Sequence, residues 1–307
     1  MPIGVLAGIV TDSHLNKPLL VVLRNQIMMR YARLLLVAVT VTCVCSCTPD
    51  KSSEGVKGRV SEIQEKVFRT PKPGPEPHIN GPVVYGCRGE REFIYRIPCT
   101  GQRPIKFAAH GLPGTLHLNA ETGIITGRTP EAPGDYDVRL EAKNSHGSSS
   151  RGFHIVVGDT LALTPPMGWN SWYIHYNRVT DADMRAAADA MIDSGMADFG
   201  YQYVNIDDCW MVKPDANDPM IAGEPRDATG AIRSNKLFPD MKALTDYIHA
   251  KGLKAGIYTS PGPLTCQSYT GSYEHEMLDA TQFAEWGFDF LKHDWCFYEN
   301  VATGEGL

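Results

Sequence analysis

A lysine and an aspartate follow an apolar run late in the sequence. Lys292 and Asp294 come directly after Phe288–Leu291, and Cys296 continues the same spacing. Alternate residues of a strand point to one side, so the ammonium and the carboxylate would lie together. In a (β/α) barrel the C-terminal ends of the strands hold the chemistry, which makes this pair a candidate for catalysis or ligand binding. A structural ion pair explains this segment equally well when it is taken alone.

Two further predicted strands carry polar groups at their ends. Tyr201–Ile206 leads into Asp207 and Asp208, and Lys254–Thr259 contains Tyr258. When such groups recur at successive strand ends of one parallel barrel, they surround a single mouth. The pattern therefore predicts one shared site for a polar ligand.

A sugar is the ligand that best suits these residue types. Its hydroxyls need charged or polar partners, and its acetal carbon needs a carboxylate that acts as nucleophile or base. Its C–H faces pack on aromatic rings, and Trp169, Trp172 and Trp210 could provide them. We therefore expect a carbohydrate site.

The elements that must position these residues alternate between strands and helices from Leu161 onward. Apolar residues at helical spacing predict helices over residues 180–192, 241–251 and 277–286. This alternation is typical of βα units on a parallel sheet. Residues 161–307 are thus expected to form a (β/α)8 TIM barrel that is truncated after about four strands.

Residues 80–158 have a different pattern, in which short β-branched and aromatic runs alternate with turn signals. The runs lie at residues 92–97, 105–109, 123–127, 135–142 and 153–157. This pattern predicts a small β-sandwich, more readily a spacer than a sugar-binding module. Cys87 and Cys99 flank one of its strands, and a disulfide between them would close a loop.

The N-terminal region is typical of an exported protein. Residues 28–44 place a basic start before an apolar run that is short for a bilayer span, which indicates a signal. The following Cys-Ser-Cys resembles a bacterial lipoprotein box in which Cys47 would carry the lipid. A plain secretory signal or a short membrane anchor is the alternative. We thus expect a cell-envelope protein, either tethered to the membrane or periplasmic.

The ranges on either side of this signal have separate interpretations. Residues 1–27 lie upstream of it and are interpreted as an artefact of start-site choice, within a signal region of residues 1–47. Residues 48–79 are rich in proline and charge and predict a linker.

The composition limits the classes of partner that the chain is expected to bind and the disulfides that it can form. The 307 residues carry a formal net charge of −6 and no cluster of basic residues, so nucleic acid is not an expected partner. Three of the eight cysteines fall in the signal region. The remaining five are an odd number in a disulfide-permissive compartment, so at least one thiol must lack a partner among them.

Five motifs together resemble glycoside hydrolase family 27, the α-galactosidase family. The resemblance covers about residues 161–298 and rests on Met167–Trp172, Asp207–Trp210, Phe238–Met241, Lys254–Tyr258 and Leu291–Cys296. Separately, the segments at residues 111–130, 134–136 and 142–147 resemble immunoglobulin-like modules that precede bacterial glycosidase domains.

The family resemblance implies roles for individual residues. It implies that Asp294 is the nucleophile that forms a glycosyl-enzyme. The galactose would be held by Lys292, Asp207, Asp208 and Trp169, with Tyr258 lining the pocket. It further implies a disulfide between Cys266 and Cys296, no metal or cofactor, and a free Cys209, whose usual partner is missing.

The reaction implied is the retaining, double-displacement cleavage of terminal α-D-galactosyl residues from oligosaccharides or glycoconjugates. The family takes its acid/base carboxyl from a later strand, which would lie beyond Leu307. We therefore expect a piece of a longer enzyme that is inactive by itself. Two alternatives stay open. One is a related specificity, α-N-acetylgalactosaminidase or β-L-arabinopyranosidase, and the other is a non-catalytic surface lipoprotein that binds glycans.

Overall fold

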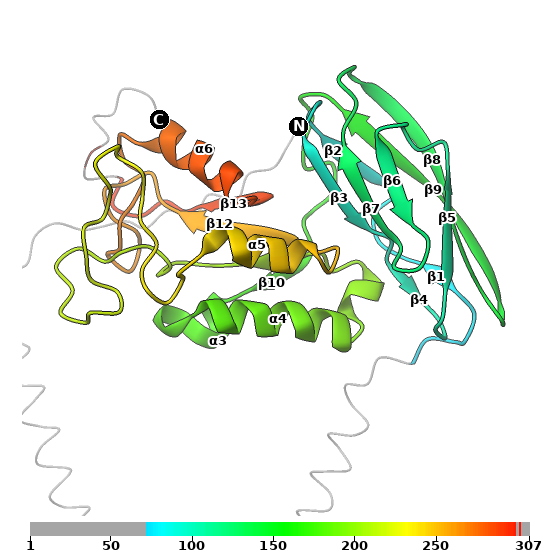
Figure 1. The fold of residues 1–307 in the computed structure, drawn as a ribbon, viewed down its shortest axis with the longest axis horizontal. Helices are drawn as coiled ribbons and strands as arrows, with labels where there is room; N and C mark the ends of the chain where they lie inside the picture. The colour runs from blue at the N-terminus through cyan, green and yellow to red at the C-terminus, as the bar shows by residue number, and fades with distance from the viewer. Residues whose placement is uncertain (1–71, 299–300, 302–307) are drawn as a thin grey trace, which may run out of the picture. The chain divides into compact units, whose positions relative to one another are not determined.

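A computed structural model describes residues 72–298 and residue 301. They form a β-sandwich followed by a parallel sheet with helices (Figure 1). The predicted signal, the lipidation site Cys47 and residues 48–71 of the predicted linker lie outside the described residues. In the part of the chain that the structure describes, no helix has both the length and the apolar character needed to cross a bilayer.

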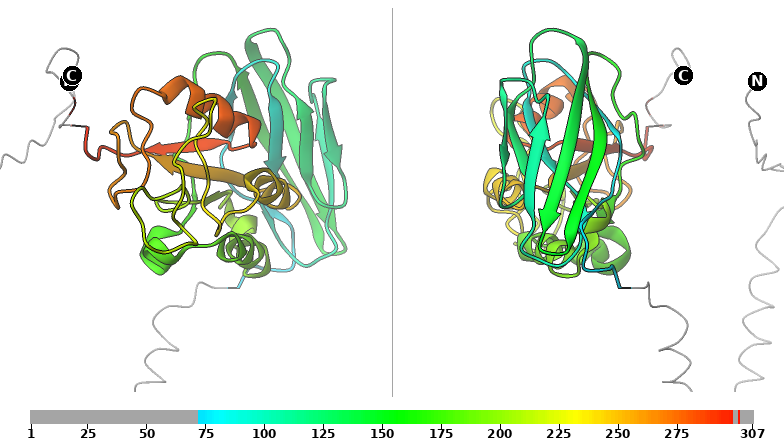
Figure 2. Two further views of the ribbon diagram at one scale, coloured as in Figure 1. Left: turned by 60° about the vertical axis from the view of Figure 1, so that its left-hand side comes forward. Right: turned by 90° about the vertical axis from the view of Figure 1, so that its right-hand side faces the viewer.

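The sandwich has two main sheets that lie face to face (Figure 2). The larger sheet has the strand order β2 (Val84–Cys87), β9 (Gly147–Val157), β8 (Gly134–Asn144) and β5 (Lys106–His110). The smaller sheet has the order β3 (Glu92–Arg96), β7 (Ile124–Arg128) and β6 (Leu116–Asn119). A separate pair joins β1 (His78–Ile79) to β4 (Cys99–Thr100).

Alternation along the strands builds the core of the sandwich. In β3, Phe93 and Tyr95 are buried while Glu92 is exposed. The Tyr95 ring stacks on Phe153 of the opposite sheet, with centroids 4.4 Å apart. Each strand thus contributes one apolar face to the space between the sheets.

The predicted immunoglobulin-like sandwich is confirmed, with differences at its edges. The five predicted strands correspond to β3, β5, β7, β8 and β9. The module also starts slightly earlier than residue 80, because β1 lies at His78–Ile79. Pro75, which precedes β1, is also hydrogen-bonded to the sandwich, because its carbonyl accepts from Gln102 N and Asn144 Nδ2.

The expected disulfide between Cys87 and Cys99 is wrong. Both thiols are free, and the two residues belong to different sheets, β2 and β4. The Cys87 thiol approaches the Val156 carbonyl at 3.7 Å, while Cys99 is fully buried in the sandwich core. Flanking one strand in sequence therefore did not bring the two sulfur atoms together.

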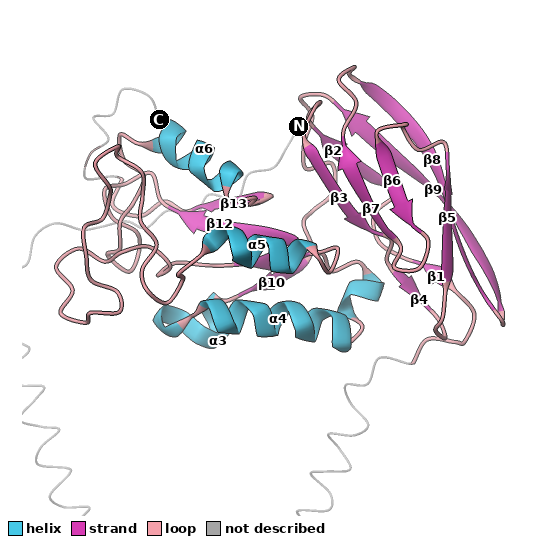
Figure 3. Cartoon of the chain, viewed as in Figure 1, coloured by secondary structure: helices cyan, strands magenta, loops and turns pink. Residues whose placement is uncertain are grey.

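The second module is a four-stranded parallel sheet, in agreement with the predicted partial barrel. Its strands follow chain order as β10 (Gly168–Asn170), β11 (Tyr203–Asn205), β12 (Lys254–Thr259) and β13 (Phe290–His293). The helices that connect and flank them are α3 (Trp172–His175), α4 (Asp181–Asp193), α5 (Met241–His249) and α6 (Glu276–Glu285) (Figure 3). Short 3-10 turns lie at Tyr176–Arg178 and Met196–Phe199.

Local signals fix the ends of the longer helices. Thr180 caps α4 in a reciprocal capping box with Asp183, and Asp240 caps α5 by accepting from Ala243 N. Gly252 follows α5 with a φ of +74°, a left-handed conformation that glycine adopts without strain. Gly252 thus ends the turn after α5, and β12 begins two residues later at Lys254.

Strand β12 is one of the two inner strands of the parallel sheet. All six of its residues are buried, as expected for a parallel strand that is covered on both faces. Ala255 and Ile257 pack with Val204 and Ile206 in the apolar core. In β13, by contrast, Leu291 and His293 are exposed and Phe290 and Lys292 are half-buried.

Candidate active site

The predicted site residues come together at the C-terminal ends of β11, β12 and β13. Asp207 lies two residues beyond β11, in a segment that continues the pairing because Ile206 N donates to Gly256 O at 2.9 Å. Tyr258 and Lys292 are register partners on β12 and β13. Asp294 follows directly, and its backbone N–H donates to Thr259 O at 2.9 Å.

Lys292 lies between two carboxylates. Its Nζ is 2.8 Å from Asp207 Oδ2 and 3.7 Å from Asp294 Oδ2. The same Asp207 oxygen accepts from Asn170 Nδ2 at 2.8 Å, and the other oxygen accepts from Asp208 N at 2.9 Å. The Asp207 carboxylate thus accepts three hydrogen bonds and is almost completely buried.

Asp294 is the more accessible of the two carboxylates. Its side chain is 42% exposed, against 5% for Asp207. One oxygen accepts from Trp295 N at 3.0 Å, and the other faces Lys292. An incoming ligand can therefore reach Asp294, while Lys292 keeps a positive charge beside it.

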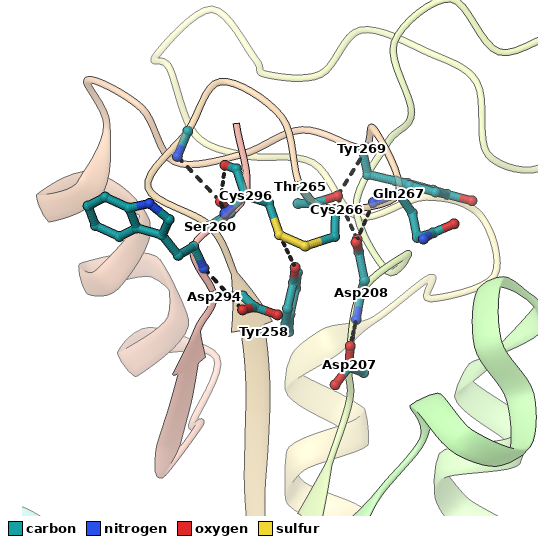
Figure 4. Close-up of a disulfide and its surroundings, with 12 residues drawn as sticks. Asp207, Asp208, Tyr258, Ser260, Thr265, Cys266, Gln267, Tyr269, Asp294 and Cys296 are labelled. Carbon is teal, nitrogen blue, oxygen red and sulfur yellow. Dashed lines mark hydrogen bonds between the residues drawn. A yellow bond between two sulfur atoms is a disulfide. The ribbon is translucent and has the colours of Figure 1, made fainter. Parts of the chain in front are cut away.

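A disulfide between Cys266 and Cys296 joins the loop after β12 to the segment after β13 (Figure 4). Their Cα atoms are 5.1 Å apart, and a carboxylate oxygen of Asp294 lies within 4.8 Å of both sulfur atoms. Because the sulfurs are bonded to each other, this group is a covalent support beside Asp294 and offers no thiolates to a metal. Ser260 Oγ adds to it by donating to Cys296 O at 2.7 Å and accepting from Cys296 N at 3.2 Å.

Asp208 faces away from this mouth and holds the disulfide-bearing loop. Its Oδ1 accepts from Thr265 Oγ1 and Cys209 N, both at 2.7 Å, and its Oδ2 accepts from Gln267 N at 2.9 Å (Figure 4). Burial is the main cause that raises the pKa of Asp208; the charge of Asp207 adds to it and these hydrogen bonds oppose it. Asp208 was predicted to bind the sugar, and in this structure its two carboxylate oxygens are hydrogen-bonded to the loop that carries Cys266.

The aromatic residues separate into wall and core. Tyr258 is buried beneath Lys292, whose Nζ lies 5.1 Å from the ring centroid. Trp169 of β10 is half-buried and packs edge-on against His175 at 5.9 Å. Trp210 is fully buried and donates to Tyr258 O at 2.8 Å. The expectation that Trp210 offers a face to a sugar is therefore wrong, because it is a core residue.

Two supporting residues were missed from the sequence. Asn170 and Ser171 bind Asp207, since Asn170 Nδ2 donates to its carboxylate and Ser171 Oγ accepts from its backbone N–H at 3.0 Å. A signal for them was available, because Asn170 ends β10 and Ser171 follows it, so both lie at the same end of the sheet.

The comparisons with known proteins agree with this geometry. A family model for alpha galactosidase A matches residues 164–306, and a model for an Ig domain matches residues 91–158. Residues 164–306 form an α-galactosidase-family domain. The resemblance to glycoside hydrolase family 27 is thereby confirmed for the barrel module.

Curated relatives of this α-galactosidase-family domain include a bacterial and a plant protein. Alpha-galactosidase A of Cellvibrio japonicus is 48% identical over 145 residues, which cover 47% of this chain and 33% of that protein. An alpha-galactosidase of Oryza sativa subsp. japonica is 42% identical over 170 residues, which cover 54% of this chain and 38% of that protein. The chain thus spans little more than a third of the length of these relatives.

A solved structure of a candidate alpha-galactosidase from Bacteroides fragilis NCTC 9343 is 42% identical, with a TM-score of 0.67. The match covers 75% of this chain and 47% of that one. A second Bacteroides fragilis structure, of a candidate alpha-galactosidase/melibiase, has the same identity and TM-score and covers 73% and 46%. Since residues 164–306 are less than half of the chain, both matches extend beyond the α-galactosidase-family domain toward the N-terminus.

Proposed function

We propose that this domain supplies the sugar-binding and nucleophile part of a retaining glycosidase site for terminal α-D-galactosyl residues. The observation that supports it most is the row Asp207, Lys292, Asp294, in which one ammonium lies between a buried and an accessible carboxylate. A nucleophile must be reachable, whereas a residue that orients a substrate can be fixed.

In the proposed reaction Asp294 attacks the anomeric carbon and forms a glycosyl-enzyme. Lys292 donates to sugar hydroxyls and keeps positive charge near the carboxylate. Asp207, held by Asn170 and Lys292, fixes the direction of the lysine. Tyr258 closes the floor of the site.

A second carboxyl group must protonate the leaving oxygen, and in retaining enzymes it lies about 5 Å from the nucleophile. Asp207 and Asp208 do not suit this role, because the oxygens of each carboxylate already accept three hydrogen bonds that hold the side chain in place. We therefore propose that the acid/base group comes from outside residues 72–298. Without that group, substrates with poor leaving groups should not turn over.

A glycosyl fluoride tests the nucleophile separately from the acid, because fluoride leaves without being protonated. With α-D-galactosyl fluoride, and without the acid/base group, we expect a burst of about one equivalent of fluoride per protein and little turnover, since attack breaks the C–F bond while Asp207 and Asp208 are not free to activate water. Asp294→Asn should abolish the burst. The matched control is α-D-glucosyl fluoride, which differs only in the configuration of one hydroxyl and should give none.

A burst that persists in Asp294→Asn would contradict the proposed nucleophile. Galactose binding without any burst in the native sequence would favour the non-catalytic, glycan-binding interpretation instead.

A further inference from the structure

The sandwich meets the barrel module at the end of the sheet opposite to the active site. Figure 1 shows β3 and β7 next to the start of β12, while the site lies beyond the other end of that strand. Side-chain contacts join the modules at three places. Each is formed by residues far apart in sequence.

The first contact is a buried lysine. Lys254, the first residue of β12, is 2% exposed, and its Nζ donates to the carbonyl of Ile94 on β3. The same ammonium lies 4.6 Å from the centroid of the Tyr85 ring on β2. Burying an ammonium costs free energy unless it is hydrogen-bonded. The sandwich offsets this cost with the Ile94 carbonyl and the Tyr85 ring.

The second contact is a close approach at the turn before β12. An added Cβ at Gly252 would lie 2.8 Å from Ile124 Cγ1 and 3.0 Å from Arg96 Cβ, both of them sandwich atoms. Arg96 also donates through Nη1 to Lys251 O at 3.2 Å. Gly252 is therefore needed for packing between modules as well as for its left-handed backbone.

The third contact is centred on Asp198, in the 3-10 turn before β11. Its carboxylate pairs with Arg103 Nη2 at 2.7 Å, and its carbonyl accepts from Asn80 Nδ2 at 2.9 Å. Nearby, an added Cβ at Gly200 would lie 2.9 Å from Gly81 Cα. Backbones of the two modules touch here.

We propose that the sandwich is the structural base of the barrel module, and that its β3–β7 end is an interaction surface for the N-terminal ends of β11 and β12. These contacts fix the start of β12, whose other end presents Tyr258 and accepts Asp294 N through Thr259. The sandwich is then neither a free spacer nor an independent binding module. Barrel stability depends on it.

Tryptophan fluorescence can follow the barrel alone, because all five tryptophans lie between residues 169 and 295 and the sandwich has none. Urea unfolding of the full chain should therefore detect sandwich substitutions only if the modules are coupled. We expect Arg103→Ala to lower the fluorescence midpoint by about 0.3 to 0.5 M. Arg88→Ala is the control, since Arg88 pairs with the exposed Asp159 and takes part in none of the three contacts, and it should leave the midpoint unchanged.

A matched pair of glycines tests the close approach. Gly195 and Gly252 have φ values of +80° and +74°, but an added Cβ at Gly195 would meet nothing within 4 Å. Both alanine substitutions carry the same backbone strain, so only Gly252→Ala should suffer the additional clash with the sandwich. We expect it to lower the midpoint by at least about 0.5 M more than Gly195→Ala.

The clash should be relieved from the sandwich side. Adding Ile124→Ala to Gly252→Ala removes Ile124 Cγ1 and Cδ1 but leaves Arg96 Cβ at 3.0 Å, so part of the lost midpoint should return. Equal midpoints for Gly195→Ala and Gly252→Ala, no rescue by Ile124→Ala, and no effect of Arg103→Ala would overturn the proposal. If Gly252→Ala does not fold, the difference between the urea midpoints of Arg103→Ala and Arg88→Ala tests whether the two modules are coupled.

Discussion

Lys292 separates two carboxylates that would otherwise repel each other. With Nζ 2.8 Å from Asp207 and 3.7 Å from Asp294, it balances part of both charges at the mouth of the sheet. Its own side chain is 41% exposed, so it can still donate to a ligand. Lys292 can thus hold Asp207 in place and still be within reach of a ligand.

Removing that charge should slow the proposed attack more than it unfolds the protein. For Lys292→Met we expect the fluoride burst to be at least about 100-fold slower, the size typical of losing one electrostatic contact in a reacting site. Lys242→Met is the control, because Lys242 pairs with Asp246 on the exposed side of α5. Equal rates for the two variants would show that Lys292 has no part in the reaction.

The free thiols should be chemically inert in the folded protein. Burial raises the pKa of Cys87 and of Cys99 to about 11, and it also raises the pKa of Cys209. A raised pKa keeps a thiol protonated, so labelling with iodoacetamide should remain slow from pH 7 to pH 9. Peptide mass spectrometry should find these three sites labelled only after denaturation. Rapid labelling of Cys209 at pH 8 would show that its surroundings are open.

Single residues show where sequence reasoning reached its limit. The strand-end rule identified Lys292, Asp294 and Asp207, because spacing along a strand fixes side and direction. The rule could not place Asp208, whose partner Thr265 lies 57 residues away in a loop. Trp210 failed for a related reason, since only tertiary packing decides whether an aromatic ring lines a pocket or fills a core.

At the level of elements, the ends of β12 and β13 are joined by a disulfide and by hydrogen bonds. The hydrogen bonds of Ser260 to the backbone of Cys296 complement the disulfide that closes a loop with a sequence separation of 30. Asp208 holds the other end of this arrangement through Thr265. The segment that carries Asp294 is thereby restrained from both sides.

Loss of the disulfide should therefore destabilise the barrel module. For Cys266→Ala/Cys296→Ala the loop entropy gives a loss of about 3 to 4 kcal/mol in the free energy of unfolding. Urea titration followed by tryptophan fluorescence measures it. Dithiothreitol should lower the stability of the native sequence by a similar amount and leave the double variant unchanged. A native sequence that is insensitive to reductant would contradict this role.

Long periodic elements were predictable and short ones were not. Helices α4 and α5 have caps and apolar spacing that identify them from sequence, and β12 is a continuous run. Strand β2 reads Val-Tyr-Gly-Cys and helix α3 has a single turn, so neither offers a local pattern. Such elements form because neighbouring strands and loops supply their contacts.

For the whole molecule, the sequence divided cleanly into sandwich and barrel, but it could not show how they meet. In the sequence, Lys254, Arg96 and Arg103 look like ordinary surface residues. In the fold, Lys254 is buried, and Arg96 and Arg103 bind residues of the barrel module. The site at one end of β12 and the sandwich at its other end belong to one compact unit, residues 72–307. A defect in the sandwich should accordingly be felt at the site.

The proposal with the widest consequences is that Asp294 is the nucleophile of this α-galactosidase-family domain. Its most direct test is peptide mass spectrometry of the full chain after reaction with α-D-galactosyl fluoride. We predict the added mass of one galactosyl residue on the peptide that contains Asp294, with fragment ions that place it on this side chain, and no addition in Asp294→Asn. A galactosyl group on Asp207 or any other residue would show that Asp294 is not the nucleophile. A protein that stays unmodified after prolonged reaction with α-D-galactosyl fluoride would show the same.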